Sequence, residues 1–200
     1  MKEKIQNKKI RNIRKYGFTL VESLVAISIL SMSIAATFTA VQSSLQNSSI
    51  AKDQTVAFYL AQEAVEFIKN RRDENALNNI KGNPNTWLTG ISANTNDLCW
   101  FGGGGTPQQT CAIDSWSNTV LDCSGGFGTC DPLKQDIVNG SSTFGLFGYT
   151  AGWTPTIFTR EIQIREVVPN VEIEVTVRIS WTSRWGSKFF VITENIFNRQ

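Results

Sequence analysis

The sequence predicts an α+β fold, in which one long N-terminal helix packs on a C-terminal antiparallel β-meander. Residues 18–81 contain neither glycine nor proline, the two strongest helix breakers, and this predicts one continuous helix. Residues 171–181 alternate between apolar and polar side chains, which is the pattern of a half-buried strand. The chain has 200 residues, a length that suits one compact domain with an anchor.

Residues 1–17 form a basic leader. It holds seven Lys or Arg residues against a single acid, Glu3. Such an excess of positive charge stays on the cytoplasmic side, which predicts an N-in, C-out, single-pass orientation in the inner (cytoplasmic) membrane. Without the leader, 12 Lys+Arg face 16 Asp+Glu, a formal charge of −4 in place of +2. The basic charge therefore reports topology, and no direct binding of nucleic acid is expected.

Residues 18–41 are predicted to be the transmembrane, N-terminal half of the helix. Glu22 is the only charged residue among them. About 20 apolar residues are needed to cross the hydrocarbon core of a bilayer as a helix, so the length is sufficient. Serines and threonines dilute the run, but their hydroxyls can bond to carbonyls of the preceding turn and so tolerate lipid.

Residues 42–81 are predicted to be the amphipathic half of the helix, which would serve as a spine for the head. The polar stretch Gln42–Ser49 is the place where the helix would fray, and Gly82 with Pro84 would end it. Apolar residues then recur at helical spacing, namely at Ala57, Leu60, Ala61, Ala64 and Ile68.

Residues 82–156 are a region of a different kind, rich in glycine and cysteine, where loops with short elements are expected. The run Gly102–Gly105 is not followed by the Gly-Lys-Ser/Thr of a phosphate loop. An even number of cysteines suggests disulfides among Cys99, Cys111, Cys123 and Cys130. Three connectivities are possible, and pairing between sequence neighbours is slightly favoured because small loops close most readily. The spacing lacks the close pairs of a zinc site.

Residues 157–200 are predicted to form a three-stranded meander whose apolar face the helix covers. The central strand carries apolar residues at odd positions from Val171 to Trp181, and a turn at Pro169-Asn170 precedes it. The first strand has an apolar set at Phe158, Ile162, Ile164 and Val168. A turn at Arg184-Trp185-Gly186 leads into the last strand, whose apolar face holds Phe190, Ile192 and Ile196.

The composition argues against an enzyme. The chain has no histidine, the commonest general base, and no spacing of acids singles out a catalytic pair. No cofactor and no metal is expected. Four loop acids could bind calcium through their oxygens, but they match no EF-hand pattern and are interpreted as solvated side chains: Asp114, Asp122, Asp131 and Asp136. Six tryptophans could pack or form an adhesive, glycan-binding surface, with packing the more common fate: Trp87, Trp100, Trp116, Trp153, Trp181 and Trp185.

The junction between charge and apolar run carries a family resemblance. The order Lys15-Tyr16-Gly17-Phe18-Thr19-Leu20-Val21-Glu22 closely resembles the prepilin cleavage signature of type IV pilins and type II secretion pseudopilins. The resemblance implies that a prepilin peptidase cuts between Gly17 and Phe18 and methylates the new N-terminus, Phe18. It also implies a pilin-like ladle, with the helix as handle and the meander in the head.

Glu22 occupies the fifth mature position, which this family keeps acidic. The resemblance implies that its carboxylate neutralises the N-terminal amine of Phe18 in a neighbouring subunit. Ionisable groups inside apolar segments are costly and usually functional. The other interpretation is a carboxylate near the helix start, held by the helix dipole.

The resemblance implies three kinds of partner: prepilin peptidase, other pilin or pseudopilin subunits through the N-terminal helix, and the inner-membrane assembly platform, all in contact with membrane lipid. The expected function is that of a minor type IV pilin-like subunit in a surface filament for adhesion, twitching motility or DNA uptake, because residues 51–72 and the meander look like minor pilins of the pilus-priming group. The alternatives are a periplasmic type II secretion pseudopilin and, third, an uncleaved membrane-anchored binding domain.

Overall fold

The computed structural model describes residues 17–83, 85–91, 99–100, 109–123, 125–184 and 186–199. The chain divides into two compact units, residues 1–50 and residues 51–200, which we call the stem unit and the head unit. The predicted boundaries of the leader and of the regions around residues 41, 81 and 156 are not tested by this division and stay predictions. Leader residues 1–16 lie outside the described residues.

Helix α1 (Leu20–Ile80) begins in the stem unit and ends in the head unit. It confirms the long helix predicted from the missing breakers, and it is helical through Gln42–Ser49, where fraying was expected. Two residues after the helix ends, Gly82 adopts the left-handed conformation with φ 84°. The Gly82 N–H donates to Asn79 O at 3.0 Å and the Asn83 N–H to Asn78 O at 3.0 Å, which satisfies carbonyls of the last turn.

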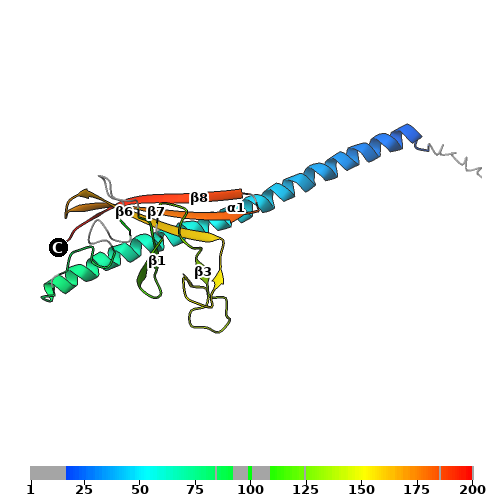
Figure 1. Cartoon of the computed structure of the whole chain (residues 1–200). Helices are drawn as coiled ribbons and strands as arrows, with labels where there is room; N and C mark the ends of the chain where they lie inside the picture. Colours follow the sequence, from blue (N-terminus) through cyan, green and yellow to red (C-terminus); the bar gives the residue numbers. More distant parts are fainter. Residues whose placement is uncertain are drawn as a thin grey trace, which may run out of the picture. The chain divides into compact units, whose positions relative to one another are not determined.

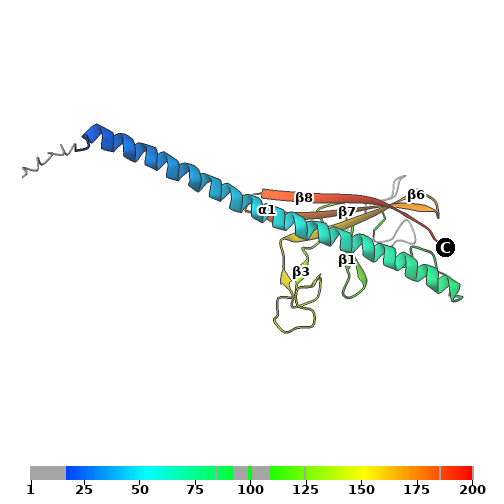
Figure 2. The same cartoon turned by 180° about the vertical axis from the view of Figure 1, so that it is seen from behind.

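The main sheet of the head has five antiparallel strands (Figures 1 and 2). Three of them form the predicted meander: β6 (Phe158–Val168), β7 (Glu172–Ser183) and β8 (Gly186–Phe197). The meander is confirmed, and two short strands from the cysteine-rich region, whose place in the sheet was not predicted, extend it beyond β6. These are β1 (Cys111–Asp114) and β2 (Thr119–Asp122), which give the order β2-β1-β6-β7-β8.

A second, smaller sheet lies in the region that was predicted to hold short elements. Its three strands have two residues each and the order β4-β3-β5: β3 (Lys134–Gln135), β4 (Phe147–Gly148) and β5 (Thr154–Pro155).

The core of the head lies between the second half of α1 and one face of the main sheet, which we call the inner face. All five helix residues predicted from their spacing are buried there, together with Val65. The central strand β7 buries alternate residues from Ile173 to Trp181, as predicted. Val168 and Val171 were predicted to face the core but are exposed, because they flank the β6–β7 turn at the end of the sheet.

Strand β6 also buries polar side chains that the apolar pattern did not indicate. Arg160 is fully buried on the inner face, where its guanidinium donates to Leu60 O of α1 at 3.3 Å and to Ile113 O of β1 at 2.5 Å. It also pairs with the Glu63 carboxylate at 3.0 Å. One arginine thus connects the helix and two strands through hydrogen bonds to two backbone carbonyls.

Candidate functional site

The residues around Gly17 form the start of helix α1. Residues 17–19 are not helical, and nothing lies within 4 Å of where a Cβ on Gly17 would be. Thr19 caps the helix: its hydroxyl accepts the Glu22 N–H at 3.2 Å, and its carbonyl accepts the Ser23 N–H at 3.1 Å. An N-cap of this kind satisfies donors that the first turn leaves free. The junction is therefore open, non-helical backbone immediately before a well-defined helix start.

The cap is a feature that the sequence interpretation missed. Thr19 and Glu22 have the Thr-x-x-Glu spacing of a capping box, in which an acid three residues after the cap suits the positive end of the helix dipole. Glu22 is the acid of the first turn, it is exposed, and it has no ion pair among the described residues. Its place at the helix start is compatible with both interpretations of its role.

The stem unit presents apolar side chains on all sides of the helix. Phe18 is 79% exposed, and the large apolar residues from Leu20 to Leu45 are all exposed in the isolated chain. Hydroxyls within this segment bond to carbonyls of the preceding turn, as expected, with Ser28 Oγ donating to Leu24 O and Ser33 Oγ to Ile29 O, both at 2.9 Å. By length and composition, α1 is the one helix among the described residues that could cross a membrane.

The four cysteines form two disulfides between sequence neighbours. Cys99 is bonded to Cys111 at the start of β1, and both are fully buried. Cys123 is bonded to Cys130, which closes a loop after β2. The Gly128 N–H of this loop donates to the Glu161 carboxylate on the face of the sheet away from α1, which we call the outer face. The run Gly102–Gly105 lies outside the described residues.

Two of the loop acids expected to be solvated are in fact buried. The Asp114 carboxylate accepts the N–H groups of Trp116 at 3.0 Å, Ser117 at 3.2 Å and Tyr149 at 3.0 Å, and so joins the β1–β2 turn to β4. Asp136 accepts the Val138 N–H at 2.9 Å and the Thr143 hydroxyl at 2.6 Å. Hydrogen bonds from Ser141, Thr143 and the Val138 N–H hold the pKa of Asp136 below its usual value. These acids organise turns.

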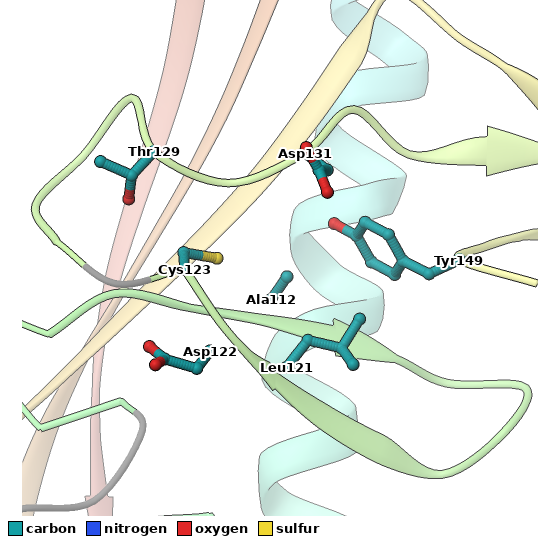
Figure 3. A pocket seen from close by; sticks show the side chains of 7 residues that line it. All are labelled: Ala112, Leu121, Asp122, Cys123, Thr129, Asp131 and Tyr149. Atoms are coloured by element: carbon teal, nitrogen blue, oxygen red, sulfur yellow. The ribbon is translucent and has the colours of Figure 1, made fainter.

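A cavity of about 140 Å³ lies beside the second disulfide (Figure 3). In Figure 3 the Asp131 carboxylate and the Tyr149 hydroxyl turn toward one another, while Asp122 lies on the other side. Burial raises the pKa of Tyr149 to about 12, although the positive charge of Arg160 acts in the opposite direction. The Tyr149 hydroxyl is thus a protonated group at neutral pH, and the chain has no histidine to act as a base beside it. Among the described residues, no cluster of three or more His, Cys, Asp or Glu could hold a metal ion.

The tryptophans divide between core and surface. Trp87, Trp100 and Trp181 are buried, as the packing interpretation expects. Trp116 is 55% exposed on the β1–β2 turn, at the edge of a groove of about 260 Å³ that is also lined by Glu63 and Leu146. Trp153 is half-buried, and Trp185 lies outside the described residues.

These features define a class of protein with a single apolar N-terminal helix that continues into an α+β head. Residues 12–38 match the family model described as the prokaryotic N-terminal methylation motif. The chain therefore carries the prepilin signal of type IV pilin-like and pseudopilin precursors. No curated protein and no solved structure gave a significant match to it.

Proposed function

We propose that the chain is a minor type IV pilin-like structural subunit. In this proposal prepilin peptidase cuts between Gly17 and Phe18 and methylates Phe18, and the mature chain then joins or primes a surface filament for adhesion, twitching motility or DNA uptake. The match of residues 12–38 to the methylation motif carries the proposal. The open Gly17 and the helix start two residues beyond Phe18 support it, because a peptidase needs an accessible, non-helical segment.

The exposed apolar stem supports assembly with other subunits. So large an apolar surface is not stable in water, and lipid or other apolar helices must cover it. Before assembly we place the chain in the inner membrane with its N-terminus in the cytoplasm, in contact with lipid, the peptidase and the assembly platform. After assembly the stem would lie among other pilin stems, and Glu22 would neutralise the amine of Phe18 in a neighbouring copy.

A type II secretion pseudopilin would have the same N-terminus and is the alternative. Whether the genes beside this one encode a pilus retraction ATPase, or an outer-membrane secretin with exported hydrolases, separates the two functions. The presence of the protein in sheared surface filaments would favour the pilus, and its restriction to the periplasm would favour the pseudopilus.

The proposed processing is tested by replacing Gly17. We expect the wild-type protein, purified from its own membranes, to begin at N-methylated Phe18 by intact mass and N-terminal sequencing. Gly17→Val should yield a membrane-inserted chain that keeps Met1–Gly17, because the bulkier side chain crowds the scissile bond. Ser44→Val, at an exposed position farther along α1, is the control and should be processed normally. A wild-type chain that retains its leader, or is cut beyond Val41, would refute the proposal.

A further inference from the structure

On the outer face of the main sheet, Arg178 makes cation-π contacts with two aromatic rings. The Arg178 guanidinium on β7 lies 5.3 Å from the ring centroid of Phe127 and 5.1 Å from that of Phe189. Phe127 belongs to the loop closed by Cys123–Cys130, and Phe189 belongs to β8. Stacking between two rings restricts the guanidinium to one orientation while leaving its charge uncompensated.

Arg178 has no ion pair among the described residues, in contrast to the other two arginines of the main sheet's long strands. Arg160 pairs with Glu63 at 3.0 Å, and Arg165 pairs with Glu174 at 2.8 Å on the same outer face as Arg178. The Arg178 Nε is buried without a hydrogen-bond acceptor in the described part of the chain. An acceptor from outside the chain cannot reach this enclosed Nε, but the residue as a whole is partly exposed, and its guanidinium has no ion-pair partner among the described residues.

One acidic side chain faces Arg178 across the strand pair but does not form an ion pair with it. Glu161 lies directly opposite Arg178 in the β6–β7 register. Its Oε1 accepts the Gly128 N–H, its Oε2 is buried without a hydrogen-bond partner in the described part of the chain, and neither oxygen comes within 4.0 Å of the guanidinium. Glu161 is fully buried under the disulfide loop, whereas Arg178 is partly exposed. The geometry therefore leaves the guanidinium available at the surface.

The surroundings of Arg178 are apolar and open. Phe189 is 65% exposed, and Val191, which pairs with Arg178 in the β7–β8 register, is 42% exposed. An apolar rim around a single cation suits one carboxylate flanked by apolar side chains, since an arginine fork binds a carboxylate with two hydrogen bonds. A polyanion such as nucleic acid is bound by several cations along its backbone, and the neighbouring Arg165 is already paired.

We propose that Arg178, Phe127, Phe189 and Val191 form a docking site for an acidic side chain on the head of another filament subunit. The inference rests on the proposed function, which supplies the neighbouring subunit. The incoming carboxylate binds the guanidinium fork, and the apolar side chains around it cover Phe189 and Val191. Only a subunit that presents one carboxylate surrounded by apolar side chains fits this site. The contact therefore selects which subunit can lie beside this chain in the filament.

The test uses the full chain in the membranes and filaments of cells that make it, with the photo-cross-linking residue benzoylphenylalanine at position 191. Irradiation should join it to another subunit. Arg178→Gln should lower the yield about tenfold, the change that corresponds to ~1.4 kcal/mol. Arg178→Lys should lose less, because it keeps the charge but not the fork. Arg165→Gln, on the same face but already paired, is the matched control and should leave the yield unchanged.

A second arm asks whether the effect is specific to the contact. Each variant is first checked for both disulfides, so that a misfolded head is recognised. Reversing the charge with Arg178→Glu should abolish the cross-link, and replacing the acid identified on the partner by Arg should restore it. An unchanged yield in Arg178→Gln, or cross-linking to a polysaccharide alone, would overturn the docking site.

Failure of this inference is distinguishable from failure of the proposed function. A wild-type chain that is cut at Phe18 and enters filaments, but whose cross-link does not depend on Arg178, overturns only the docking site. A wild-type chain that is absent from filaments overturns the filament function itself. If Arg178 serves only Glu161, Glu161→Gln and Arg178→Gln will lower the melting temperature of the head equally and neither will change the cross-link, which also overturns the site.

Discussion

The two halves of helix α1 have opposite surfaces although they form one uninterrupted element. The half in the stem unit has its large apolar side chains exposed and directs its hydroxyls back to its own carbonyls. The half in the head unit buries one apolar face against the sheet. The head therefore supplies its own cover, whereas the stem must obtain cover from lipid or other subunits. Substitutions in the stem should impair assembly without unfolding the head. Substitutions in the core of the head should lower its stability without preventing insertion of the stem.

The largest effect is expected at Glu22. If the stem enters a helix bundle, an unpaired charge there is costly, so Glu22→Val should lower the amount of protein in sheared filaments by at least about tenfold, relative to its total in the membrane. Glu22→Asp keeps the acid on a shorter side chain and should lose part of that amount. Processing and both disulfides should be unaffected. Equal incorporation of wild type and Glu22→Val would show that the carboxylate serves only the helix start.

The reciprocal change is Arg160→Met in the head. Its loss removes the buried hydrogen bonds to the Leu60 and Ile113 carbonyls and the pair with Glu63, which should lower the free energy of unfolding by about 2–4 kcal/mol. The matched control is Arg165→Met, which removes an exposed pair and should cost less than about 1 kcal/mol. Melting of the full chain in detergent micelles, followed by near-ultraviolet circular dichroism, measures both. Similar melting temperatures for Arg160→Met and Arg165→Met would mean that the Arg160 contacts do not stabilise the packing of the helix on the sheet.

The sequence predicted the stem better than the head for a physical reason. An apolar run without breakers and a signature of eight consecutive residues are local features. The burial of Arg160 depends on a carbonyl 100 residues away, and that of Glu161 on a loop 33 residues away. Strands β1 and β2 have only four residues each, too few for a periodic pattern. Their place in the sheet follows from pairing with β6, and the roles of Asp114 and Asp136 follow from turns that only the fold creates.

The disulfide loop offers a smaller test of how independent the head is. Replacing both Cys123 and Cys130 by Ala should lower the free energy of unfolding by roughly 2–3 kcal/mol in the chain-entropy estimate for so short a loop. It should also loosen Phe127 and Gly128 from the outer face. Insertion of the stem should not change. Wild-type protein purified without reductant should show no alkylatable thiol, and four reactive cysteines would contradict the disulfide framework.

The smallest effect is expected at Tyr149 and concerns pH. Its pKa is raised from 10.0 to about 12 in the folded head, so the unfolded chain loses the phenolic proton first as the pH rises. The associated stability is present below pH 10 and should be lost between pH 10 and about 12. Tyr149→Phe should remove that part of the pH dependence in thermal melts. Near neutral pH it should change stability little, because the buried hydroxyl has no partner among the described residues. A steep alkaline loss that persists in Tyr149→Phe would assign it to another group.

The Thr19 cap lies one residue after the proposed cleavage site, so cleavage would place a new positive charge at the start of the helix. In the precursor, the residue before the cap is joined to Gly17 by a neutral peptide bond. Cleavage there would create an ammonium group one residue before the cap, beside the positive end of the helix dipole. In the proposed function, maturation would place like charges together in an apolar environment, and a carboxylate from another subunit would relieve their repulsion. The proteolytic step would then act as the timing signal for polymerisation, because the uncut chain has no free amine to neutralise.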